Sequence, residues 1–153
     1  MTFLRGLFGG LANSCKDPVF GSLQRLDGQW SGRMTWQHSP IPFALTVHRT
    51  DEVPSRVDRA VFEELQRNYP AMRSSLQGAL HDLWSAVPGA NGPEFPGVGG
   101  SLDLWAKLQL QGLGLHPDGH VELIYGFTDA SLPAGAFIVA VHGTDVEPLE
   151  YVE

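Results

Sequence analysis

The sequence predicts a single α+β domain spanning residues 1–153, in which two helices pack on one face of a mainly antiparallel sheet of about six strands. Apolar and polar residues alternate towards both ends of the chain, as they do in strands with one buried face. In the middle, apolar residues recur every three or four positions, which indicates helices. The chain has no internal repeat, and its length suits one core. The expected order is β-β-β-α-α-β-β-β.

Three strands are predicted over residues 18–50. The Asp27-Gly28 pair lies between the first two, and such a pair readily adopts the positive φ angles of a tight hairpin turn. By the period of two, the residues that share a face are Trp30, Gly32, Met34 and Trp36 on the second strand and Phe43, Leu45 and Val47 on the third.

Two helices are predicted after Thr50, where the period changes. Ser55 and Asp58 form a capping-box pattern, so the first helix is expected to begin near Pro54 or Ser55. Pro70 begins the second helix, because proline is tolerated in a first turn but not in a helix interior. The expected buried faces are Val57, Ala60, Val61 and Leu65 in the first helix and Met72, Leu76, Ala79, Leu80, Leu83 and Trp84 in the second.

Residues 88–100 contain five glycines and three prolines, which predicts an irregular connection between the helices and the rest of the sheet. No lysine follows in the GK[ST] arrangement of a phosphate loop. A ligand lid is the alternative role, with Asn91 and Glu94 as its polar side chains.

The remaining strands come from the last third of the chain. Apolar and polar residues alternate most clearly in residues 102–111, which predicts a strand with Trp105 on its solvent-exposed face. The HPDGH turn leads into HVELIYGFT, FIVAVHG supplies another strand, and PLEYV is a candidate for a further short one. The buried face predicted for the 102–111 strand consists of Leu102, Leu104, Ala106, Leu108 and Leu110.

Charge is distributed unevenly along the chain. Residues 1–50 contain five basic and two acidic side chains, and residues 51–107 contain five basic and eight acidic ones. Residues 108–153 contain seven acidic side chains and no lysine or arginine, so they account for the net charge of −7. Nucleic-acid binding requires many basic residues and is therefore not expected. An acidic surface instead favours a basic protein partner.

The acidic end also supplies the residues expected to bind that partner. Aromatic side chains surrounded by polar ones concentrate binding energy in protein interfaces. The alternative is that the carboxylates only keep the protein in solution. The candidate partner-binding residues are Trp105, Glu122, Asp145, Glu147, Glu150 and Tyr151.

No catalytic or cofactor motif is recognisable, so we expect a protein that is not an enzyme and needs no cofactor. HExxH, GxSxG and the dinucleotide-binding glycine pattern are all missing from the sequence. His116 and His120 flank a turn with Asp118 between them. A structural zinc site usually has four ligands, and the sequence places only this pair of histidines together, so we predict no metal there. Cys15 is not expected to act as a nucleophile, because the sequence places no activating histidine beside it.

The N-terminal apolar segment, residues 1–16, is expected to dock on the protein's own core. Its apolar stretch is interrupted by glycines and matches a lipoprotein signal poorly, which favours a cytoplasmic protein. No run of about 20 apolar residues exists, so no transmembrane segment is predicted.

Three segments of the chain resemble small α+β bacterial proteins of unknown function, some of which are regarded as immunity proteins of polymorphic toxin systems. These segments are DPVFGSLQRLDGQWSG, QRNYPAMRSSLQGAL and VELIYGF, and the resemblance extends from Asp17 to Glu153. It implies a non-catalytic protein that neutralises a cognate toxin by stoichiometric binding, and it assigns no catalytic residue.

Two other functions are alternatives to the immunity function. One is an adaptor that binds a peptide or a small molecule, and the other is an enzyme whose active-site residues are dispersed along the sequence. A toxin gene beside this one would favour the immunity function, whereas a deep polar pocket would favour either alternative.

Overall fold

The computed structural model describes residues 13–49, 52–90, 92–93, 95 and 98–153. Its framework is an eight-stranded sheet in which the strands lie in chain order. Every neighbouring pair is antiparallel except β4 and β5, which are parallel. The strands are β1 (Ser14–Asp17), β2 (Gly21–Leu26), β3 (Gln29–Trp36), β4 (Ser39–Val47), β5 (Leu108–Leu115), β6 (Val121–Phe127), β7 (Ala136–His142) and β8 (Asp145–Val152).

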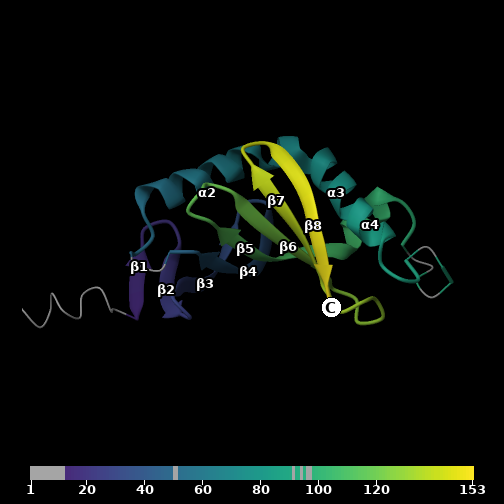
Figure 1. Cartoon of the computed structure of the whole chain (residues 1–153), viewed down its shortest axis with the longest axis horizontal. Helices are drawn as coiled ribbons and strands as arrows, with labels where there is room; N and C mark the ends of the chain where they lie inside the picture. The colour runs from purple at the N-terminus through teal and green to yellow at the C-terminus, as the bar shows by residue number, and fades with distance from the viewer. Residues whose placement is uncertain (1–12, 50–51, 91, 94, 96–97) are drawn as a thin grey trace, which may run out of the picture.

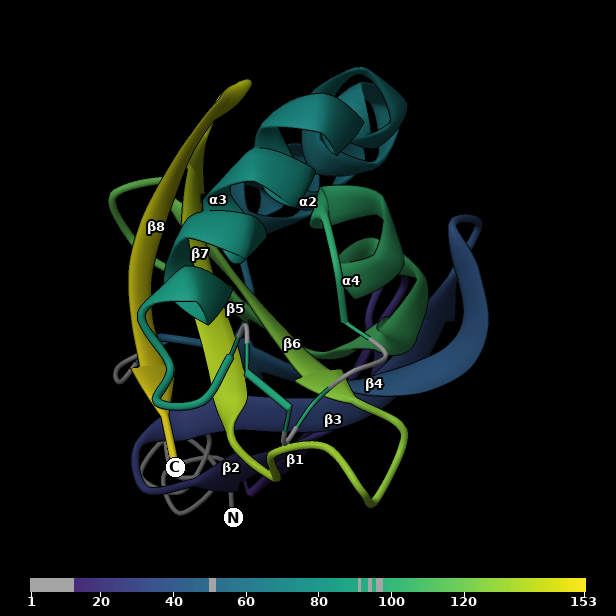
Figure 2. The ribbon, with the colours of Figure 1, turned by 90° about the vertical axis from the view of Figure 1, so that its right-hand side faces the viewer.

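The helices occupy the connection between β4 and β5, and they lie on one side of the curved sheet (Figures 1 and 2). A parallel pair of strands needs a crossover of this kind, because its second strand must start again at the same end of the sheet. The helical elements are α2 (Arg56–Asn68), the 3₁₀ turn η1 (Tyr69–Met72), α3 (Arg73–Ser85) and α4 (Ser101–Lys107).

The predicted α+β class and the one-sided packing of the helices are confirmed. The predicted sheet was wrong in its number of strands, which is eight instead of about six. It is mainly antiparallel, as predicted, but the parallel pair β4–β5 makes it a mixed sheet. The first half contributes four strands instead of three, since Ser14–Asp17 pairs with β2. Residues 1–12 of the N-terminal segment lie outside the described residues, and Ser14 to Lys16 belong to β1.

The first hairpin forms as predicted. Asp27 has a φ of 50° and Gly28 a φ of 76°, and Leu26 pairs with Gln29 across the two-residue turn. The predicted inner residues of the third strand of the sequence, now β4, are also confirmed, since Phe43 and Val47 are fully buried.

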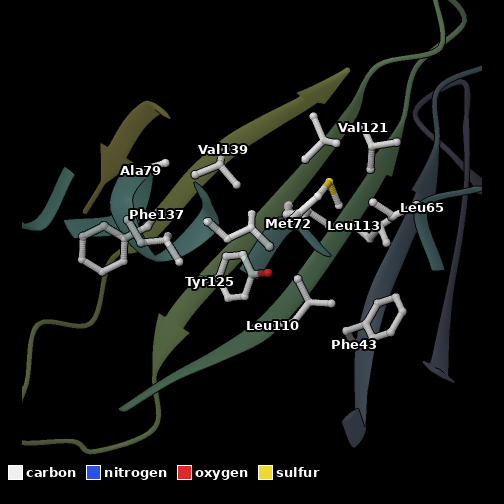
Figure 3. Packing of buried hydrophobic residues seen from close by; sticks show 14 of the residues in the cluster. Phe43, Leu65, Met72, Ala79, Leu110, Leu113, Val121, Tyr125, Phe137 and Val139 are labelled. Carbon is white, nitrogen blue, oxygen red and sulfur yellow. The ribbon is translucent and has the colours of Figure 1, made fainter. Parts of the chain in front are cut away.

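The core fills the space between the sheet and the helices. The inward side chains of the sheet meet Leu65, Met72 and Ala79 from the helices in Figure 3. Trp84 of α3 is fully buried and forms edge-to-face contacts with Phe127 and Phe137. The buried face predicted for the second helix is therefore confirmed, with Leu83 only partly buried.

A buried charged side chain lies at the start of α2. Ser55 is the N-cap, and its side chain accepts a hydrogen bond from the backbone N–H of Asp58. Asp58 Oδ2 accepts hydrogen bonds from the Ser55 N–H at 2.7 Å and from Arg49 Nε at 2.6 Å. Asp58 is only 3% exposed, so these donors compensate for the loss of water around its carboxylate.

The predicted inner face of α2 needs a correction. Phe62 and Leu65 are buried beside the Asp58 cap, whereas Val57 is 58% exposed and Ala60 lies at the surface. The buried capping box sets the rotation of the helix about its axis, and this rotation turns Val57 towards solvent.

The prediction of one continuous strand over residues 102–111 was wrong in its first half. Residues Ser101–Lys107 form α4, and β5 begins only at Leu108. Leu102 is 69% exposed, whereas Leu104 is fully buried against the core. Asp103 in the first turn and Lys107 in the last turn interact favourably with the helix dipole. The strict alternation of apolar and polar residues in this segment is typical of a strand, so it did not indicate a helix.

In the connection over residues 88–100, the described residues 88–90, 92–93, 95 and 98–100 form turns and bends and no helix or strand. Ala90 and Val98 are buried against the core, so parts of the connection are anchored. Asn91 and Glu94, the polar side chains of the predicted lid, lie outside the described residues.

Replacing Asp58 by alanine should destabilise the fold by about 2–4 kcal/mol, because the change removes the cap of α2 and leaves the Arg49 side chain without its partner. Glu63→Ala on the exposed side of the same helix is the control, and it should change stability by less than about 0.5 kcal/mol. Urea denaturation measures both. Equal stabilities for the two variants would contradict a structural role for the Asp58 cluster.

Candidate functional site

The sheet has an outer face, defined here as the face opposite the helices. Residues directly opposite each other on neighbouring strands share a face. On β7, Phe137, Val139 and Val141 point into the core, so the residues between them belong to the outer face.

Three carboxylates of β8 lie on this outer face. Asp145 pairs with His142, Glu147 with Ala140, and Glu150 with Ile138. The last pairing depends on a register shift in β8, because strict alternation would place Glu150 on the face opposite to Glu147. The bulge therefore brings together acidic residues that the sequence pattern separates.

These three side chains form the β8 acidic face (Asp145, Glu147 and Glu150), which is exposed and lies on a strand at the edge of the sheet. Within the described part of the chain, no lysine or arginine nitrogen lies within 4.0 Å of their carboxylates. Leu149 and Val152 on the same strand are each 44% exposed, so apolar surface accompanies the charge.

Three of the other four acidic residues in residues 108–153 have local contacts instead. Asp118 contacts His120, and Glu122 lies between His116 and His120. Asp129 Oδ1 accepts hydrogen bonds from the backbone and the hydroxyl of Ser131, which lower the pKa of its carboxyl. The seven carboxylates are therefore not one continuous patch.

Both aromatic residues among the candidate partner-binding residues, Trp105 and Tyr151, lie away from the β8 acidic face. Tyr151 packs on the buried Phe137, with ring centroids 4.9 Å apart, so it belongs to the inner side of the sheet. Trp105 lies on α4 instead of a strand, and its ring contacts Tyr125 at a centroid distance of 5.8 Å.

Trp105 instead forms a wall of an open hollow between α4, η1 and the β3–β4 turn. The hollow has a volume of about 320 Å³ and is lined by aromatic rings that include Trp36, His38 and Tyr69. A second hollow of about 370 Å³ adjoins it and adds Arg73, whose guanidinium carbon lies 6.0 Å from the Trp105 ring centroid.

Hydrogen bonds fix the walls of this aromatic hollow. The Tyr69 and Tyr125 hydroxyls are 2.6 Å apart, and His38 Nε2 lies 2.7 Å from the carbonyl oxygen of Gln66. Burial raises the pKa of Tyr69 and raises the pKa of Tyr125 well above its usual value. Both phenols therefore stay protonated near neutral pH, which suits binding better than proton abstraction.

Four histidines form a row across one end of the outer face, which we call the histidine row (His48, His116, His120 and His142). The rings of His48 and His116 stack with centroids 4.0 Å apart, as do those of His116 and His120. His142 continues the row at 5.3 Å from His120. Burial, then the neighbouring His116, lowers the pKa of His48, so this ring favours its neutral form.

From the sequence, only His116 and His120 could be placed beside each other, because they flank one turn, whereas His48 and His142 were interpreted as dispersed residues. A local signal for all four exists, because each histidine adjoins a buried strand residue: Val47, Leu115, Val121 or Val141. In the sheet, Val47 of β4 pairs with Leu115 of β5, Leu115 pairs with Val121 of β6, and Val121 pairs with Val141 of β7. The parallel register of β4 and β5 was needed to see that the histidines are neighbours.

Comparisons of the chain with models of protein families, with curated proteins and with solved structures find no match. Among the described residues, no helix has both the length and the apolar character needed to cross a membrane. The resemblance to immunity proteins and the cytoplasmic location both stay predictions from the sequence.

The tyrosine pair in the aromatic hollow can be tested by a double-mutant cycle. We expect Tyr69→Phe and Tyr125→Phe each to lower stability, and the double variant to lose about 1 kcal/mol less than the sum of the two. The reason is that either single change leaves one hydroxyl without its partner. Urea denaturation of the four proteins measures the coupling, and strictly additive losses would contradict the hydrogen bond.

Proposed function

We propose that the chain is a non-catalytic protein-binding module that holds a basic partner protein on the β8 acidic face. The observation that carries this proposal is the set of three exposed carboxylates, without a basic partner in the described chain, on the outer face of an edge strand. Unpaired surface charge of one sign speeds the association with a protein of the opposite sign and disfavours partners of the same sign.

The edge position adds a second means of attachment. An edge strand presents backbone N–H and C=O groups that a strand of another protein can pair with. Leu149 and Val152 add apolar area beside these groups, as the contact surface of an interface requires. Charges on an edge strand also discourage self-association, so the same residues favour a basic partner over a second copy of the chain.

The most specific form of the proposal is an immunity protein that neutralises a basic bacterial toxin by stoichiometric binding. This form rests on the resemblance of three sequence segments and on the one-signed charge of the last segment. Glu122 and Tyr151, which were expected to contact the partner, are engaged by the histidines and by Phe137 and are left out of the proposed contact.

Charge reversal at two positions of β8 tests the docking surface. The partner to use is the product of a toxin gene adjacent to this one, co-purified with the chain. We expect Glu147→Lys with Glu150→Lys to weaken binding about tenfold or more at low salt and to flatten its salt dependence, because attraction becomes repulsion. Titration calorimetry at two salt concentrations gives both quantities.

The matched control reverses two exposed carboxylates on the helices, Glu63→Lys with Asp82→Lys, so the net charge changes equally. This variant should keep its affinity within about twofold, since only long-range attraction is lost. Equal losses in both variants would mean that net charge, and not the β8 acidic face, governs binding.

A second candidate function is the binding of a small aromatic carboxylate in the aromatic hollow. Trp36 lines this hollow, and its buried Nε1 has no hydrogen-bond partner among the described residues. Trp105 and Tyr69 supply flat apolar walls, and Arg73 supplies a cation at the adjoining hollow. A hollow of this size accepts a ligand of one or two rings.

Arg73→Gln should weaken the binding of an indole carboxylate about tenfold and leave the binding of uncharged indole unchanged, because the guanidinium contacts only the acidic group. Ligand-detected NMR titration measures both compounds. Arg56→Gln on the exposed side of α2 is the control and should alter neither. A loss for both ligands in Arg73→Gln would contradict a carboxylate contact.

A further inference from the structure

The strongest unexplained cluster in the molecule is the centre of the histidine row. His116 Nε2 lies 3.2 Å from Glu122 Oε1, and His120 Nε2 lies 3.7 Å from the same oxygen. Each of these three residues offers a ligand atom within 4.8 Å of the others. Ligands around a tetrahedral zinc ion lie about 3.4 Å apart, since each metal–ligand bond is about 2.1 Å long. We propose that His116, His120 and Glu122 bind a divalent transition-metal ion, with Zn²⁺ as the reference ion.

The orientation of His120 is set by a carboxylate on its far side. Asp118 Oδ1 contacts His120 Nδ1 and also accepts a hydrogen bond from the His120 backbone N–H at 3.0 Å. With the proton on Nδ1 directed at Asp118, the Nε2 lone pair of His120 is left for the cluster. Histidines that bind metals commonly have such a carboxylate behind them, and it raises the basicity of the ligand nitrogen.

The environment of the His116 side chain is a second, independent indication that a ligand is missing from the cluster. Its Nε2 atom is buried and has no hydrogen-bond partner among the described residues, although Glu122 Oε1 is close by. A buried polar atom in this state is costly, and a bound ion would satisfy it. The imidazole side chain as a whole is 19% exposed, so the cluster lies close enough to the surface for an ion to enter.

The backbone beneath the cluster leaves space that a side chain would fill. A Cβ atom at Gly114 would lie 3.1 Å from His48 Nε2 and 3.6 Å from His116 Nε2. Glycine at this position of β5 therefore keeps the floor of the site open. It also offers a way to obstruct the site without removing any ligand.

The donor set decides the class of ion. Two imidazole nitrogens and one carboxylate oxygen suit Zn²⁺, Co²⁺, Ni²⁺ and Cu²⁺, whereas Mg²⁺ and Ca²⁺ prefer oxygen ligands throughout. The rings of His116 and His120 are inclined by only 10°, so their lone pairs lie side by side and one ring must rotate for both to bind one ion. His48 Nδ1 accepts a hydrogen bond from the amide nitrogen Gln29 Nε2 at 2.7 Å, which leaves the ring proton on Nε2, so His48 is not counted as a ligand.

Zn²⁺ is titrated into the full-length chain, free of any histidine tag, and followed by calorimetry. We expect one ion to bind per chain. His116→Ala and His120→Ala should each weaken binding by about tenfold or more, because each removes one of three ligands. His81→Ala on α3 is the control and should keep the affinity of the parent, since it removes a histidine far along the chain from the row.

Two further variants separate metal binding from simple loss of structure. Asp118→Asn should weaken Zn²⁺ binding by about 10- to 100-fold as a positioning change, and it should shift the visible spectrum of the Co²⁺-loaded chain. Gly114→Ala should also weaken Zn²⁺ binding, although every ligand is present. The thermal stability of each metal-free variant shows whether it is folded.

An absence of saturable Zn²⁺ binding by the parent chain would overturn the proposal. So would unchanged affinity in His116→Ala and His120→Ala, since the ion would then bind elsewhere. The test involves no partner protein, and a chain with Glu147→Lys and Glu150→Lys should bind Zn²⁺ as the parent does. Failure of the metal site and failure of the β8 acidic face are therefore distinguishable.

Discussion

The parallel pairing of β4 with β5 is the constraint on which the rest of the structure depends. It joins the antiparallel strands β1–β4 to the antiparallel strands β5–β8 in one sheet, with Ala44 opposite Gly112 and Val47 opposite Leu115. The chain must return to the starting end of β4 to make this pair, and the helices provide that return. They therefore cover one face of the sheet, and no other helix of the described residues covers the opposite face (Figure 2).

This one-sided cover leaves the outer face to the charged and histidine side chains of the strands. The inner face is filled by large apolar side chains, and the buried Asp58 at the start of α2 is used for a helix cap and an ion pair. The outer face carries carboxylates at the β8 edge and the histidine row at the end shared by β4 to β7. Asp145 pairs with His142, so the two features adjoin.

Local signals in the sequence predicted the parts of the fold that local physics controls. The Asp27-Gly28 turn, the Ser55 cap and the apolar stripe of α3 each depend on residues close in sequence. The parallel strand pair, the rotation of α2 and the helix at Ser101–Lys107 depend on contacts between residues distant in sequence. The pattern of apolar and polar residues therefore did not predict them correctly. The same limit applies to the site: acidic residues could be counted, but the bulge that brings Glu150 beside Glu147 could not be seen.

Stability alone gives no reason for the composition of the histidine row. Positions on the outer face of a sheet favour β-branched or aromatic residues, whose cross-strand contacts do not depend on charge. The imidazole rings in this row stack with centroids 4.0 Å apart, so positive charge on two neighbouring rings would be repulsive. Neutral rings are also the form that binds metal ions. A row that has Asp118 and Glu122 in contact with it and lies over a glycine has the properties of a ligand set more than those of a structural one.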